Sequence, residues 1–160
     1  MKIEPLFIRF ANSQIDTLGV VTSIISPDLN EYSKGIAERA KLNLPDLGVF
    51  RRDFKKALED LIDNGPNQMF RNYVDSYMKP SLVEFLDRGG DNRVSERRWV
   101  NIKAEDAPWV EALLCYNTCL YIKMYGTKEL KLCPICSKFF SNKGKYAKYC
   151  SEGCKAQGKK

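Results

Sequence analysis

Histidine is absent from all 160 residues of this sequence. The absence excludes Ser-His-Asp and Cys-His catalytic sets, HExxH proteases, HNH nucleases and Cys2His2 zinc fingers, because each of them needs an imidazole. Carboxylate, lysine or cysteine chemistry remains for catalysis, and no spacing in the sequence indicates such a site. We therefore expect no enzyme, although an enzyme that uses carboxylates stays open as an alternative.

The sequence also lacks a long apolar run. No stretch approaches the roughly 20 residues that cross a bilayer, and the opening MKIEPLFIRFANSQ lacks the apolar stretch of a signal peptide. An apolar content of 44% with 29% charged residues is typical of globular chains. These features predict a soluble cytoplasmic protein with no membrane partner.

Six cysteines are present, and four of them form two short pairs. Two residues separate Cys133 from Cys136, three separate Cys150 from Cys154, and thirteen lie between the pairs. In a reducing compartment such pairs favour metal binding over disulfides. Zinc suits four thiolates because it is redox-inert, borderline soft and readily tetrahedral. The spacing predicts that these four cysteines bind one zinc ion per chain.

The sequence favours other interpretations of the cysteines less than a zinc site. The four could be reduced or disulfide-bonded without metal. A thioredoxin-like role for Cys133 and Cys136 would need a βαβ context, which the flanking sequence does not offer. Cys115 and Cys119 lie four residues apart in an apolar helical pattern, so we expect them to be buried core thiols.

Positive charge is concentrated at the end of the chain. Residues 131–160 carry eight lysines and one acidic residue, a sum of +7, so residues 1–130 sum to −1. Lysines that alternate with aromatic residues suit phosphate contact and base stacking. The candidate nucleic-acid-binding lysines are Lys138, Lys143, Lys145, Lys148 and Lys155. The aromatic residues among them are Phe139, Phe140, Tyr146 and Tyr149. A protein-binding finger and a purely structural zinc module remain alternatives.

Hydrophobic periodicity predicts an α-helical N-terminal domain over residues 1–126. The expected helices cover about 27–41, 46–64, 69–78, 81–89 and 106–126. The last is apolar on most sides, with a stripe from Trp109 to Met124, so we expect it to be the central helix. Residues 3–10 are expected to be extended, and residues 89–106 to form a basic loop or small hairpin.

Residues 130–160 are expected to form a separate zinc module. Phe139 and Phe140 begin one arm of a predicted β-hairpin, Gly144 lies in its turn, and residues 146–149 form the returning arm. Cys150 then lies at the entry to a terminal helix that Ser151 can cap. A thiolate at a helix N-terminus is favoured by the helix dipole.

The segment CPICSKFF followed by KYCSEGCK resembles short intracellular treble-clef zinc fingers. It is similar in layout to the CGNR-type finger, which follows an all-helical domain in bacterial proteins taken to be transcription regulators, and to the MYND finger with its YCSxxC pattern. Here CKAQ stands where the first family has Gly-Asn-Arg after the last cysteine. The resemblance implies a treble clef, bound zinc, and DNA binding in transcription regulation.

Overall fold

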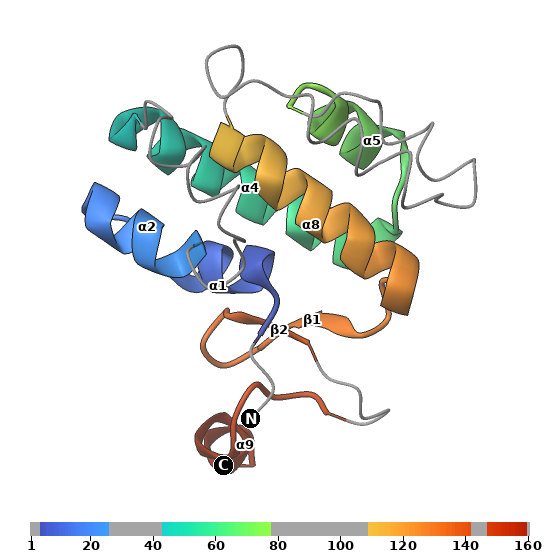
Figure 1. Ribbon diagram of the computed structural model, residues 1–160. Helices are drawn as coiled ribbons and strands as arrows, with labels where there is room; N and C mark the ends of the chain where they lie inside the picture. Colours follow the sequence, from blue (N-terminus) through green and yellow to red (C-terminus); the bar gives the residue numbers. More distant parts are fainter. Residues whose placement is uncertain (1–3, 26–42, 78–108, 142–146, 160) are drawn as a thin grey trace.

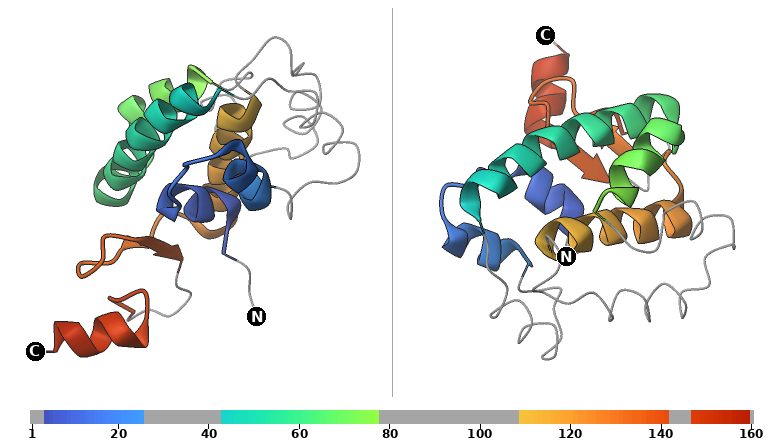
Figure 2. Two further views of the ribbon diagram at one scale, coloured as in Figure 1. Left: turned by 90° about the vertical axis from the view of Figure 1, so that its left-hand side faces the viewer. Right: turned by 90° about the horizontal axis from the view of Figure 1, so that it is seen from above.

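The computed structural model describes residues 4–25, 43–77, 109–141 and 147–159. Within these ranges the protein is mainly helical, with six helices and one two-stranded antiparallel sheet. The elements are α1 (Leu6–Asn12), α2 (Leu18–Ile25), α4 (Leu44–Asn64), α5 (Gln68–Asp75), α8 (Trp109–Tyr125), β1 (Leu130–Leu132), β2 (Phe139–Ser141) and α9 (Glu152–Gly158). The sheet lies between the other helices and α9 (Figure 1 and the left view of Figure 2). This arrangement confirms the predicted fold class, a helical part followed by a small module of hairpin and short helix.

Helix α4 follows closely from its sequence. The Asn43 side chain caps it by accepting a hydrogen bond from the Asp46 N–H at 3.1 Å, and Gly65, with φ of 73°, ends it. Its apolar stripe is buried, and the members are Leu47, Phe50, Phe54, Leu58 and Leu61. Helix α5, capped by Asn67, lies against α4 and buries Phe70 and Val74. Both helices were predicted, although α5 ends at Asp75 and not near Met78.

Helix α1 corrects the expectation of an extended segment at residues 3–10. Pro5 stands at its N-cap, where the missing N–H costs nothing, and its carbonyl accepts from the Ile8 and Arg9 N–H groups. A short apolar run alone cannot distinguish a strand from a helix buried on most sides. Here α1 contacts α2, α4, α8 and β2, and its buried residues are Leu6, Phe7, Ile8, Phe10 and Ala11.

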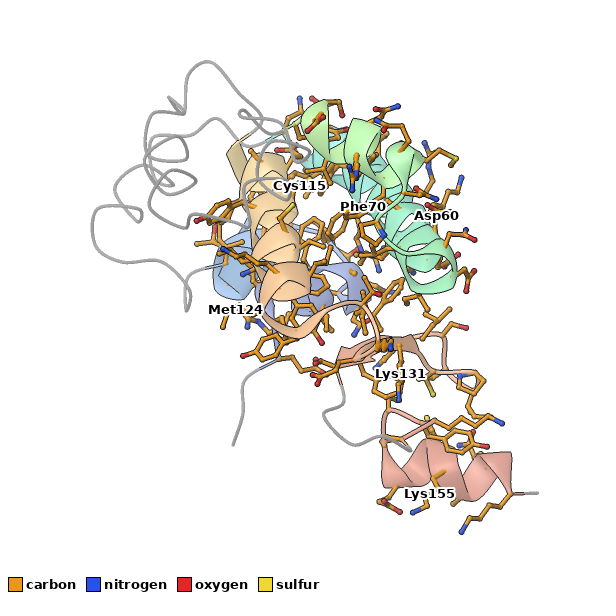
Figure 3. All side chains as sticks on the ribbon, turned by 90° about the vertical axis from the view of Figure 1, so that its right-hand side faces the viewer. Asp60, Phe70, Cys115, Met124, Lys131 and Lys155 are labelled. Atoms are coloured by element: carbon orange, nitrogen blue, oxygen red, sulfur yellow. The ribbon has the colours of Figure 1, made fainter. Side chains whose placement is uncertain are left out.

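Helix α8 forms much of the core, and it confirms the predicted helix up to Gly126. Cys115 and Cys119 have no exposed surface and belong to the core cluster, as expected. The position of Met124 corrects the predicted stripe, because its side chain is 65% exposed on the outer side of the helix end (Figure 3). The buried surface of α8 includes Tyr116 of that stripe as well as Val110 and Leu114. Because α1 contacts four other elements, it shares the central position that we expected of α8 alone.

Several predictions fall on parts of the chain that the structure does not describe. They are the helices at about 27–41 and 81–89 and the loop or hairpin at 89–106. Helix α2, an uncharged LGVVTSII segment, was not predicted.

Among the described ranges, no helix combines the length and the apolar character needed to cross a membrane.

The small sheet is joined to the helices by a polar clamp. The Asn12 side chain, at the end of α1, pairs with the backbone of Phe139 in β2. Its Nδ2 donates to the Phe139 carbonyl at 2.7 Å, and its Oδ1 accepts from the Phe139 N–H at 2.8 Å. Tyr121 in α8 and Ser141 share a further hydroxyl hydrogen bond at 2.6 Å. Leu130 and Phe139 belong to the same core cluster as the helices. A domain division between residues 126 and 130 stays a prediction.

Candidate metal centre

The first cysteine pair lies in the turn that joins β1 and β2. The strands pair antiparallel, with Leu132 opposite Phe139. Cys133 follows β1 directly, and its N–H donates to the Lys138 carbonyl at 2.9 Å while its carbonyl accepts from the Ser137 N–H at 2.9 Å. Ser137 adopts φ of 56°, which lets the chain reverse within so few residues. The result is a tight knuckle that holds two sulfur atoms on one side.

The second cysteine pair lies at the start of α9. Ser151 caps this helix, and its Oγ accepts from the Cys154 N–H at 3.2 Å, as the sequence predicted. The predicted hairpin arms, however, were wrong. The partner of β2 is β1, so the hairpin precedes residue 142 and contains the knuckle, and residues 147–149 form no strand. Residues 142–146, with Gly144, lie outside the described ranges.

The four sulfur atoms of Cys133, Cys136, Cys150 and Cys154 all lie within 4.8 Å of one another. The Sγ atoms of Cys136 and Cys150 are 3.3 Å apart, and those of Cys150 and Cys154 are 3.7 Å apart. A tetrahedral zinc ion with Zn–S bonds of about 2.3 Å would place its sulfurs about 3.8 Å apart. The geometry therefore fits four ligands around one ion, and the cluster can bind a metal.

The electrostatics of the cluster also favour a cation. Burial raises the pKa of Cys133, but the N–H groups of Cys136, Cys150 and Ile135 point at its sulfur and bring that pKa down to about 6. Burial and the neighbouring sulfurs instead raise the pKa of Cys150 to about 12. Four thiolates this close repel one another, so full ionisation needs a positive ion among them.

Thiol counting should separate the two classes of cysteine. Cys115 and Cys119 are buried, and this burial raises the pKa of each thiol above its usual value. In the folded protein with metal removed, we expect an aromatic disulfide reagent to modify the accessible Cys136, Cys150 and Cys154 quickly and to leave Cys115 and Cys119 unmodified. All six should react after denaturation. Six fast-reacting thiols in the folded state would contradict the packing of α8.

Three of the five candidate lysines lie in described parts of the module. Lys138, Lys148 and Lys155 are exposed, whereas Lys143 and Lys145 lie outside the described ranges. The side chain of Lys155, labelled on α9 in Figure 3, makes an exposed 3.6 Å contact with Glu152. All three described side chains are accessible to an anionic partner.

The aromatic residues behave differently from the sequence expectation. Phe139 and Phe140 are 1% and 4% exposed, so neither offers a face for base stacking, and that part of the prediction is wrong. Tyr149 packs beside α9, where a methyl group at Gly158 would overlap its ring. Lys148 Nζ lies 5.8 Å from the centre of the same ring. Tyr146 lies outside the described ranges.

Sequence reasoning missed the residues that hold the centre in place. Asn12 is 127 positions from Phe139, and nothing local distinguishes it from a surface asparagine. Lys131, counted only as a charge, donates to the Ala147 carbonyl at 3.0 Å and so fastens the chain that leads to Cys150. Both interactions depend on tertiary structure, and a single sequence carries no local signal for them.

Comparison with known proteins adds no family to this picture. No protein-family model matches the chain, and no curated protein or solved structure matches it. The resemblance to CGNR-type and MYND fingers therefore stays a prediction. We therefore infer the function from the site itself.

Proposed function

We propose that the four clustered cysteines bind one zinc ion and that the module built around it contacts nucleic acid. The observation that supports the metal is the sulfur geometry, in which four Sγ atoms lie within 4.8 Å of one another. Tetrahedral S4 sites bind zinc or iron. A colourless protein with one zinc and no iron per chain would identify zinc.

The role of the zinc is structural. Helix α9 has seven residues and no buried side chain, so apolar packing stabilises it little. Two of the ligands, Cys150 and Cys154, lie at its start, and the other two lie on the knuckle of the sheet. The ion thus fastens α9 to the sheet, and the sheet is fastened to the helices.

Contact with nucleic acid is supported by charge. Residues 131–160 sum to +7, and the four thiolates with one zinc ion would remove about two of these charges. Lys138, Lys148 and Lys155 are exposed there. Lysine contacts to phosphate are independent of base sequence, so we expect backbone binding with little sequence preference. The helical part would regulate or assemble this function, as in a transcription regulator.

A salt titration tests this proposal. We expect affinity for duplex DNA or RNA to fall steeply with salt, and the double substitution Lys138→Gln with Lys155→Gln to reduce the slope by about 1.8, which is two phosphate contacts at about 0.9 each. The matched control is Lys55→Gln with Lys56→Gln on α4, which removes the same charge from the helical part. Equal slopes for the two variants would contradict phosphate contact by the module.

A protein-binding finger is the second candidate, and the tip of the knuckle favours it. Pro134, Ile135 and Cys136 are exposed there, and Ile135 exposes 40% of its apolar side chain. One zinc per chain together with no salt-sensitive binding to nucleic acid would favour this function, or a purely structural module, over the first.

A further inference from the structure

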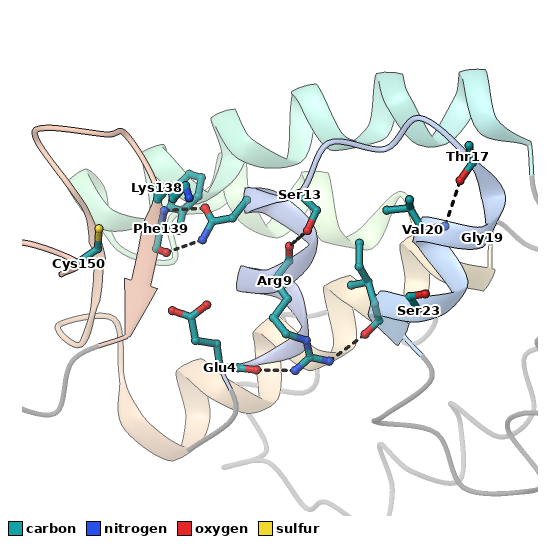
Figure 4. Close-up of a pocket in the computed structure, with 12 residues that line it drawn as sticks. Glu4, Arg9, Ser13, Thr17, Gly19, Val20, Ser23, Lys138, Phe139 and Cys150 are labelled. Carbon is teal, nitrogen blue, oxygen red and sulfur yellow. Dashed lines mark hydrogen bonds between the residues drawn. The ribbon is translucent and has the colours of Figure 1, made fainter. Parts of the chain in front are cut away.

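A groove lies between α2 and the metal-binding module, and residues of α1 line it. It has a volume of about 1100 Å³. Lys138, Phe139 and Cys150 line one side, residues of α2 line the other, and Arg9 lies between them (Figure 4). Asn12 also lines the groove. This volume is slightly larger than the roughly 300–1,000 Å³ of small-molecule pockets, so an open groove of this size suits a segment of a polymer.

The charges around the groove favour an anionic occupant. Arg9 is held in place by two backbone carbonyls, since its guanidinium donates to Glu4 O at 2.5 Å and to Ile24 O at 2.9 Å. Lys138 adds a second cation from the module, and Glu4 contributes the one carboxylate among the lining residues. The groove therefore carries a positive charge, and the residues of one of its walls belong to the cationic segment 131–160.

The opposite wall is uncharged and built from small or apolar residues. Helix α2 reads LGVVTSII, and Gly19 and Ser23 are exposed on it beside the half-buried Val20 and Ile24. Apolar side chains of this kind can pack against the face of a base. That face is free only when the base is not stacked on its neighbours in the strand. A duplex keeps its bases stacked and paired, so a single strand matches this wall better.

We propose that this groove binds a single-stranded segment of nucleic acid, with phosphates toward Lys138 and Arg9 and bases against α2. The inference rests on the proposed function, and it adds a location and a strand preference to it. Asn12 and Cys150 also line the groove, so the clamp and the metal centre fix the spacing between its two walls.

Two neighbouring substitutions on α2 test the groove. Ser23 lines it, whereas Thr22 is exposed on the same helical turn but does not line it. The substitutions Ser23→Glu and Thr22→Glu add the same charge in the last turn of α2, so their effects on the helix should match. The probe is a short fluorescent oligothymidylate, and zinc-loaded protein is titrated by anisotropy at low salt. We expect Ser23→Glu to weaken binding about tenfold and Thr22→Glu to weaken it less than about twofold.

The outcomes distinguish the groove from the proposed function. If the unaltered protein binds the probe and both variants bind it as tightly as the unaltered protein, the groove is not the binding site, and the proposed function stands. Equal weakening by both variants indicates a long-range charge effect and also overturns the groove. If the unaltered protein binds neither single strand nor duplex, the proposed function fails and the groove fails with it. A tighter affinity for duplex than for single strand would contradict the strand preference.

Discussion

Replacing Cys150 with serine is expected to remove the metal and release residues 147–159, while the helical part stays folded. Three remaining thiolates bind zinc far more weakly than four, and α9 has no buried side chain to keep it in place. The sheet should persist, because Leu130 and Phe139 lie in the main core and Asn12 clamps β2. We expect zinc to fall from one per chain to a small fraction, and hydrogen exchange to lose protection only in α9.

A core cysteine supplies the matched control for this substitution. Cys119 is fully buried in α8, away from the sulfur cluster. The change Cys119→Ala should leave zinc at one per chain and lower the free energy of unfolding of the helical part by about 1–2 kcal/mol, through the cavity it creates. A Cys150→Ser protein that kept a full complement of zinc would overturn the four-ligand assignment. Loss of the whole fold would contradict the independence of the core from the metal.

The helices that could be predicted from the sequence are those with local signals. Helix α4 has a capping Asn43, an apolar stripe at helical spacing and a terminating Gly65, so each boundary is encoded within a few residues. Helix α1 has none of these signals. Five of its seven residues are buried because four elements contact it, and Pro5 suggested an extended segment until these tertiary contacts were known.

The same difference between local sequence signals and tertiary contacts explains which parts of the metal centre could be predicted. Ligand pairs such as Cys133 and Cys136 are close in sequence, so their spacing predicts a shared metal ion. The pairing of β1 with β2 was mispredicted because the 142–146 segment, with its central glycine, looks more like a hairpin turn than the knuckle does. The knuckle reverses the chain through Ser137, which has a positive φ. Serine rarely adopts this conformation, and the local sequence does not predict it.

The Asn12 clamp gives the module its position, and its loss should be costly. The change Asn12→Ala leaves the N–H and carbonyl of Phe139 without partners in a half-buried place. At about 1–3 kcal/mol for each of the two unsatisfied groups, we expect a loss of about 2–6 kcal/mol in the free energy of unfolding. Asn43→Ala, which removes an exposed helix cap, should cost only about 1 kcal/mol. Chemical denaturation of the zinc-loaded proteins measures both.

The variant Asn12→Asp makes the geometry of the clamp testable through pH. An ionised carboxylate keeps the acceptor for the Phe139 N–H, but its second oxygen faces the Phe139 carbonyl and repels it. A protonated carboxyl can donate to that carbonyl as the amide does, so folding should raise the pKa of Asp at this position above its unfolded value of about 3.9. The folded state then binds more protons, and stability increases as pH falls through the raised pKa toward about 4. Metal loss at low pH lowers the stability of Asn12→Ala equally. The difference in free energy of unfolding between Asn12→Asp and Asn12→Ala therefore reports the protonation of the carboxyl at position 12 alone. If this difference stays constant between pH 7 and pH 4, the side chain at position 12 does not pair with the Phe139 backbone.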